Sequence, residues 1–183
     1  GFGRGFEVSV LTLRKEHNQL LAAQILNAVF AGGLDEAVER LGDLVALLVF
    51  AAPGAEALLF GADQASLFAI DEQTGKLTFL NKQPTQGDAP CHLVVDSTGK
   101  NVLAANYTGG SCICIPIEVD GKLGKATSFQ QHEGKKKNGH SIHVDKANKF
   151  ALCCDLGLDK VIIYAFDPAK GTLTPHEIGR AHV

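Results

Sequence analysis

Two stretches of the sequence decide its fold: His92-Leu-Val-Val-Asp-Ser-Thr-Gly-Lys-Asn-Val-Leu-Ala-Ala-Asn106 and Ile142-His-Val-Asp-Lys-Ala-Asn-Lys-Phe-Ala-Leu-Cys-Cys-Asp155. Each holds two short apolar runs around a polar turn, which is typical of two antiparallel strands. Four positions coincide at an offset of 49 residues: Asp96 with Asp145, Gly99 with Asn148, Lys100 with Lys149, and Asn106 with Asp155. A repeat of this length, built from strands and turns, predicts the blades of a β-propeller.

A second landmark recurs at offsets of 46 and 50 residues, as Thr74-Gly-Lys-Leu77, Asp120-Gly-Lys-Leu123 and Lys170-Gly-Thr-Leu173. Strands are predicted at 66–70, 76–80, 92–95, 101–105, 111–118, 141–144, 150–154 and 160–166, with a long polar loop over 127–138. Four strands per repeat is the composition of a propeller blade. We therefore predict a mainly β chain in which 63–177 form an incomplete β-propeller of two to three four-stranded antiparallel blades.

Residues 1–62 have a different pattern. Apolar residues recur at helical spacing over 20–29 and again over 34–45, and Pro53-Gly54 follows as a stop signal. This pattern predicts a helical N-terminal segment over 1–62. The segment is either a helical extension of the propeller or mistranslated or wrongly joined sequence.

Both ends of the chain suggest a partial sequence. There is no Met at position 1 or elsewhere, and Ile178-Gly-Arg-Ala-His-Val183 reads like a translated sequencing adapter. We expect 178–183 to be a non-native tail and exclude it from fold reasoning. A few blades leave strand edges unpaired, so we expect this fragment alone to be inactive.

Composition limits the classes of partner. The net charge of −3 gives no reason to expect nucleic acid or an anionic membrane, and Lys135–Lys137 read as a solvated loop. The apolar run Leu44–Ala52 is too short to span a bilayer. The five cysteines are odd in number and fit no zinc spacing. Read as small buried residues, they suit a reducing compartment, so we expect a cytoplasmic protein.

Several segments resemble the bacterial lactonase family of seven-bladed β-propellers, which includes 6-phosphogluconolactonases and carboxymuconate cyclases. They are Ser66–Leu80, Ala89-Pro-Cys-His92, Ala105-Asn-Tyr-Thr-Gly-Gly-Ser111 and Asp155-Leu-Gly-Leu-Asp-Lys-Val161. The resemblance runs from about Ser66 to Glu177 and leaves 1–62 outside. It implies hydrolysis of a sugar lactone, most specifically 6-phosphoglucono-δ-lactone to 6-phosphogluconate, without a cofactor. The alternatives are a non-catalytic binding scaffold and a carboxymuconate-lactonising enzyme. The oligomeric state stays open.

The resemblance also implies a catalytic histidine. The family's Pro-His-Ala-His-Ser segment falls on Lys137-Asn-Gly-His-Ser141, so its second histidine is His140 and its first is replaced by Asn138. Lactone hydrolysis needs a base that activates water, and an imidazole titrates near neutral pH. We therefore expect His140 to be the base, with a structural role as the alternative. The family's later Arg and Glu candidates would lie beyond Glu177.

Four further residues are candidates for substrate binding: His92, Ser141, Asn106 and Asp155. His92 opens the strand equivalent to that of His140, and it either lines the same funnel or forms a hydrogen bond between blades. Asn106 and Asp155 occupy equivalent places after a strand, where repeated polar residues usually hold a turn. A metal site built from His132, His140 and His143 is not predicted, because their spacing matches no standard site.

Overall fold

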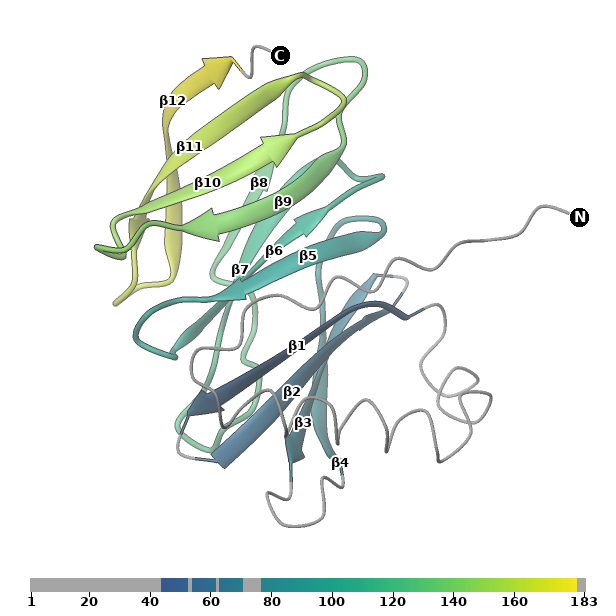
Figure 1. Cartoon of the computed structure of the whole chain (residues 1–183), viewed down its shortest axis with the longest axis vertical. Helices are drawn as coiled ribbons and strands as arrows, with labels where there is room; N and C mark the ends of the chain where they lie inside the picture. Colours follow the sequence, from purple (N-terminus) through teal and green to yellow (C-terminus); the bar gives the residue numbers. More distant parts are fainter. Residues whose placement is uncertain (1–43, 53, 62, 71–76, 181–183) are drawn as a thin grey trace, which may run out of the picture.

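The computed structural model describes residues 44–52, 54–61, 63–70 and 77–180. These residues form three four-stranded antiparallel sheets, each with its strands in sequence order (Figure 1). The first sheet contains β1 (Leu44–Ala52), β2 (Gly54–Gly61), β3 (Gln64–Ile70) and β4 (Leu77–Pro84); the second contains β5 (Pro90–Val95), β6 (Asn101–Asn106), β7 (Ser111–Pro116) and β8 (Ser128–Gln131); the third contains β9 (Gly139–Val144), β10 (Phe150–Asp155), β11 (Lys160–Asp167) and β12 (Thr172–Arg180).

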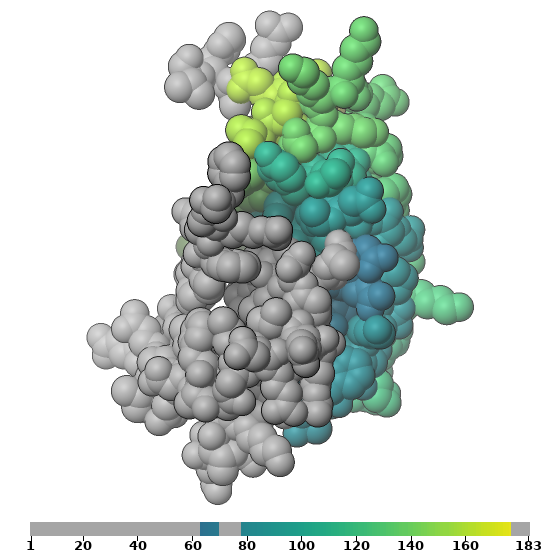
Figure 2. Space-filling model, turned by 90° about the vertical axis from the view of Figure 1, so that its right-hand side faces the viewer, coloured from purple at the N-terminus to yellow at the C-terminus, as the bar shows by residue number. Residues whose placement is uncertain are grey.

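The sheets follow one another as blades of a propeller do. Each first strand contacts that of the next sheet, since β5 touches both β1 and β9, and the three sheets succeed one another along the long axis of the molecule (Figure 1). Figure 2 shows the same order on one face, where the described surface passes from the first sheet in blue through the second in teal to the third in green. The prediction of a mainly β chain with four-stranded antiparallel sheets is confirmed.

The repeated aspartates build the same turn in two blades. The Asp96 carboxylate accepts hydrogen bonds from the backbone amides of residues 98, 100 and 101, and the Asp145 carboxylate accepts from those of 147, 149 and 150. Gly99 and Asn148 hold the left-handed position of these turns, with φ of 70° and 59°, which Gly and Asn tolerate best. The 49-residue repeat is thus a repeat of hairpin turns.

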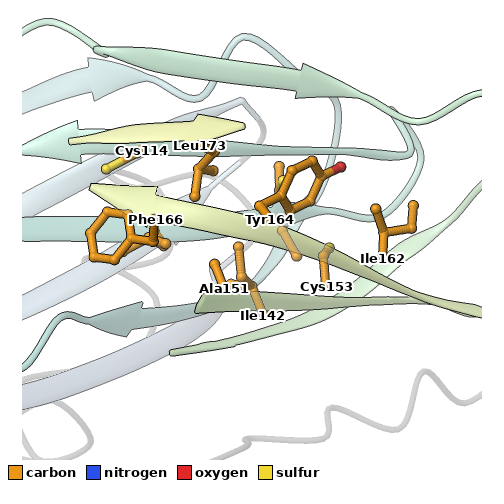
Figure 3. Close-up of a cluster of buried hydrophobic side chains, with 11 residues drawn as sticks. Cys114, Ile142, Ala151, Cys153, Ile162, Tyr164, Phe166 and Leu173 are labelled. Atoms are coloured by element: carbon orange, nitrogen blue, oxygen red, sulfur yellow. The ribbon is translucent and has the colours of Figure 1, made fainter. Parts of the chain in front are cut away.

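Two apolar cores lie between the sheets. The core between the first and second sheets contains Ala65, Leu67, Leu93, Val102, Ala104, Ile113, Ile115 and Leu123. The core between the second and third includes Leu103, Cys112, Ile142, Cys153, Tyr164 and Phe166 (Figure 3). Every residue of β6 is buried, because the central sheet is covered on both faces. This explains why its strands read as continuous apolar runs instead of alternating patterns.

The Gly-x-Leu landmark marks a polar contact between blades. Asn81 on β4 bonds both the amide and the carbonyl of Leu123, and Ser128 on β8 does the same for Leu173. Gln83 also donates to the carbonyl of Leu123, and Gln130 also donates to the carbonyl of Leu173. The outer strands β4 and β8 are thereby each tied to the next sheet's segment.

The helical prediction for 1–62 is wrong where the structure describes it. Leu44–Ala52 and Gly54–Gly61 are strands β1 and β2, which pair with each other and with β3. Periodicity cannot separate a short buried strand from a buried helix segment, and here pairing with β3 decides. The predicted helix at 20–29 lies outside the described residues. Among those that are described, no helix is long and apolar enough to cross a membrane.

Two other boundaries also change. The loop predicted over 127–138 contains β8. Its four residues, three polar and one aromatic, pair with β7 at the outer edge of the sheet. Strand β12 continues to Arg180 by pairing with β11, so 178–180 are part of the third sheet. The origin of 178–183 stays a prediction.

Candidate active site

The first strands of the second and third sheets each begin with a bulge. In the pairing of β5 with β6 the register skips Cys91, and in that of β9 with β10 it skips His140. A bulge bends a strand and re-aims the extra side chain, and such bulges are common beside active sites. Cys91 and His140 therefore occupy equivalent places in neighbouring blades.

His140 projects into solvent beside an aromatic residue of the preceding blade. Its ring lies edge-on to that of Tyr107, with centroids 5.9 Å apart and planes at 71°. Tyr107 directly follows β6, and its carbonyl accepts a hydrogen bond of 3.2 Å from the Asn138 side chain. The tertiary structure thus brings two exposed polar rings from different sheets together.

The Cys91 thiol supports the backbone at this bulge. Its Sγ lies 3.2 Å from the carbonyl oxygen of Gly139 and 3.3 Å from that of His140. Burial is the main reason that the pKa of this thiol rises to about 12. It therefore stays protonated near neutral pH and acts as a hydrogen-bond donor that fixes the start of β9.

His92 lies inside, between the second and third sheets. It is buried, and its Nδ1 accepts a hydrogen bond of 3.2 Å from the amide of Ile142. Its ring centroid is 4.9 Å from that of His143. Burial, followed by the neighbouring His143 and His140, lowers the pKa of His92 to about 4. These features favour the alternative in which His92 joins two blades as a neutral acceptor. Ser141 is half-buried next to His140.

Asn106 and Asp155 end equivalent strands and are both buried. The Asn106 amide donates to the carbonyl of Thr85 at 3.2 Å and to the Ser111 hydroxyl at 3.0 Å. The Asp155 carboxylate accepts from the backbone amides of residues 138 and 158, and its Oδ2 lies 2.5 Å from Nδ1 of His132. Asn106 Oδ1 is buried without a hydrogen-bond partner among the described residues. The partners of the other polar atoms come from the protein itself, which favours a structural role for both residues over substrate contact.

His132, His140 and His143, for which the sequence predicts no metal site, lie in different surroundings. His132 is buried against Asp155, whereas His140 and His143 are exposed on β9. Instead, His132 gathers with Cys112 of β7 and Cys153 of β10. Sequence spacing missed this cluster because its members come from three segments that only the packing of two sheets unites.

Comparison with known proteins places these features in a family context. The profile of a family described as a lactonase with a seven-bladed β-propeller matches residues 48–182. The match begins within β1, so the resemblance extends further toward the N-terminus than the motifs after Ser66 indicate. This agrees with the pairing of β1 and β2 in the first sheet.

Individual relatives agree with the profile. The chain is 34% identical over 121 residues to a 6-phosphogluconolactonase of Bacillus subtilis and 30% identical over 100 residues to one of Formosa agariphila, covering 62% and 50% of this chain. It spans 34% and 28% of the lengths of these curated relatives. A crystal structure of a candidate 6-phosphogluconolactonase from Bacteroides fragilis superimposes with a TM-score of 0.58 and 30% identity, over 66% of this chain and 37% of that one.

Proposed function

The chain belongs to the lactonase family of seven-bladed β-propellers, and from this premise we propose that it contributes three blades to an enzyme that hydrolyses a sugar lactone. The substrate that the named relatives support is 6-phosphoglucono-δ-lactone, with 6-phosphogluconate as the product. Cytoplasmic location, expected from the cysteines, is part of the same proposal.

His140 is the proposed general base. Water attacks the lactone carbonyl while the His140 imidazole takes a proton from that water. The carbonyl oxygen becomes an oxyanion, the ring C–O bond then breaks, and the leaving alkoxide takes up the proton that the His140 imidazole received from water. The observation that carries this role is the bulge at His140, which aims an exposed imidazole away from the sheet beside Tyr107.

Other groups around His140 suit the remaining needs of the reaction. The Tyr107 hydroxyl is a donor on the adjacent blade, and the half-buried Ser141 is a second one on β9 itself. A phosphorylated substrate needs cations or amides around its phosphate. Lys135–Lys137 lie just before β9. Because three residues of extended chain span at most about 11 Å, the Cα atoms of Lys137 and His140 are no further apart than that. We propose that this loop attracts the phosphate.

The test uses a seven-bladed protein that carries this segment. Replacing His140 by Ala should lower kcat for 6-phosphogluconolactone hydrolysis at least about a hundredfold, the usual contribution of a general base. His143→Ala is the matched control, since His143 is an exposed histidine on the same strand that this mechanism does not use.

The outcomes separate the competing functions. Equal turnover by the His140→Ala and wild-type proteins would return His140 to a structural role. Hydrolysis or formation of a carboxymuconolactone, with none of the sugar lactone, would identify the other branch of the family. Absence of both activities in a folded seven-bladed protein would support a binding scaffold.

A further inference from the structure

A cluster of thiols and an imidazole lies in the interior between the second and third sheets, apart from His140. The sulfur atoms of Cys112 and Cys153 and a ring nitrogen of His132 all lie within 4.8 Å of one another, and all three residues are buried. Cys112 is on β7, Cys153 is on β10, and His132 directly follows β8. Tyr164 belongs to the hydrophobic core that also contains Cys112 and Cys153 (Figure 3).

The orientation of His132 is fixed by a carboxylate. Its Nδ1 lies 2.5 Å from Oδ2 of Asp155, and both side chains are fully buried. A carboxylate that holds one nitrogen of a histidine leaves the other with its lone pair free, which is the usual arrangement behind a metal-bound histidine. Among the described residues, Nε2 of His132 is buried without a hydrogen-bond partner. A buried polar atom in this condition costs about 1–3 kcal/mol unless something binds it.

The equivalent positions one blade earlier carry different residues. Gln64 pairs with Pro84 and Ser111 pairs with Gln131, so Cys112 and His132 correspond to Ala65 and Thr85, 47 residues earlier. By the 49-residue offset, Cys153 corresponds to Ala104 and Asp155 to Asn106. The propeller architecture therefore does not require two thiols, an imidazole and a carboxylate at this place.

We propose that Cys112, Cys153 and His132 bind a thiophilic divalent metal ion, with Zn²⁺ as the best match. Two thiolates and one imidazole nitrogen are ligands that Zn²⁺ prefers, and Asp155 orients the imidazole as the outer partner. The two thiol protons are released to solvent on binding. Because the ligands come from two sheets, the ion links β7 and the end of β8 to β10.

The direct test measures metal binding by the purified, reduced 183-residue chain. After treatment with a chelator, the chain is dialysed against Zn²⁺ and its metal content is determined. We expect one tightly held Zn²⁺ per chain. With Co²⁺ as the probe, we expect a sulfur-to-cobalt charge-transfer band, which reports thiolate ligation. A chain that retains no Zn²⁺, or a Co²⁺ spectrum without thiolate bands, would overturn the proposal.

Variants identify the ligands. Cys112→Ala and Cys153→Ala should each weaken Zn²⁺ binding at least about a hundredfold, and Asp155→Asn should weaken it about ten- to a hundredfold, as loss of an outer partner does. Cys154→Ala is the matched control, because Cys154 is the next residue on β10 and its side chain points to the opposite face. Unchanged binding in the Cys112 and Cys153 variants would assign the metal elsewhere and overturn the site.

A competing state of the two thiols is a disulfide. Titration of the denatured chain should give five free thiols, matching the five free cysteines of the structure. Three free thiols, with Cys112 and Cys153 joined in a proteolytic peptide, would overturn the metal proposal. If an alanine variant does not fold, the Co²⁺ spectrum of the unmodified chain still decides.

Discussion

The two junctions between the described sheets use equivalent positions but different chemistry. At the junction of the first and second sheets, the neutral Asn106 amide donates a hydrogen bond of 3.2 Å to the backbone carbonyl of Thr85. At the junction of the second and third sheets, His132 and Asp155 stand at the equivalent positions, and His132 Nδ1 lies 2.5 Å from Asp155 Oδ2. Burial would lower the pKa of His132, but Cys153 and Asp155 outweigh it and raise that pKa. The first junction is therefore neutral and the second is ionisable.

The comparison teaches that a repeat conserves geometry more strictly than chemistry. Both junctions keep the hairpin turns, the bulged first strands and the ties from Asn81 to Leu123 and from Ser128 to Leu173. Within this frame, alanines at the first junction become thiols at the second. Stability of the second junction should therefore depend on partners, pH and metal in ways that the first does not.

The largest effect is expected from removing the buried carboxylate. Asp155→Ala leaves His132 unpaired in the interior and strips two backbone amides of their acceptor. Breaking a buried pair in this way costs about 3–5 kcal/mol. Urea unfolding followed by circular dichroism measures it, because the chain has no Trp. A loss below about 1 kcal/mol would mean that the junction tolerates an unpaired His132.

A pH effect should also be confined to the second junction. Because burial lowers the pKa of His92 to about 4, protonation favours the unfolded chain once pH falls below its usual value of about 6.5. Stability from the neutral imidazole is complete above that pH and is lost down to about pH 4, by up to about 3 kcal/mol. His92→Asn keeps an acceptor for the amide of Ile142 but does not titrate.

The measurement compares the two proteins in urea at pH 7 and at pH 4.5. The difference between their free energies of unfolding should be smaller at pH 4.5 than at pH 7, because only the wild-type protein loses the His92 contribution. Parallel pH profiles would show that His92 is not held neutral by burial.

A smaller effect is expected at the neutral junction. Asn106→Ala removes donors to the Thr85 carbonyl and the Ser111 hydroxyl without leaving a charge. The loss of buried hydrogen bonds should cost about 1–3 kcal/mol, with little change between pH 5 and 8. Urea midpoints across this range provide the check. A loss larger than that of Asp155→Ala would reverse the comparison.

The smallest effect should come from replacing the ionisable pair of the second junction by the neutral residues of the first. The double variant His132→Thr, Asp155→Asn gives the second junction the residues of the first. Replacing a buried ionic pair as a unit is often close to neutral, so we expect a change within about 1.5 kcal/mol and a partial rescue compared with Asp155→Ala. Metal-free protein is used for all of these measurements. A loss equal to that of Asp155→Ala would show that the two junctions are not interchangeable.

The candidate site was predictable only where residues lie close in sequence. The segment around His140 and Ser141 could be found from a motif, but the bulge that exposes His140 and the approach of Tyr107 depend on strand register. His92, Asn106 and Asp155 were predicted as candidates for substrate binding from their places at strand ends. Their burial, which favours structural roles, could not be read from strand position, because it depends on the next sheet.

The sequence by itself determined the blade. The 49-residue repeat and its Asp-based turns are local signals, because hydrogen bonds within each turn enforce them. Tertiary structure decided what the local pattern leaves open. It made Leu44–Ala52 a strand, since an apolar run takes its conformation from the sheet that pairs with it. It also placed Cys112, His132 and Cys153 together, because contacts across a junction depend on how two sheets stack and not on spacing along the chain.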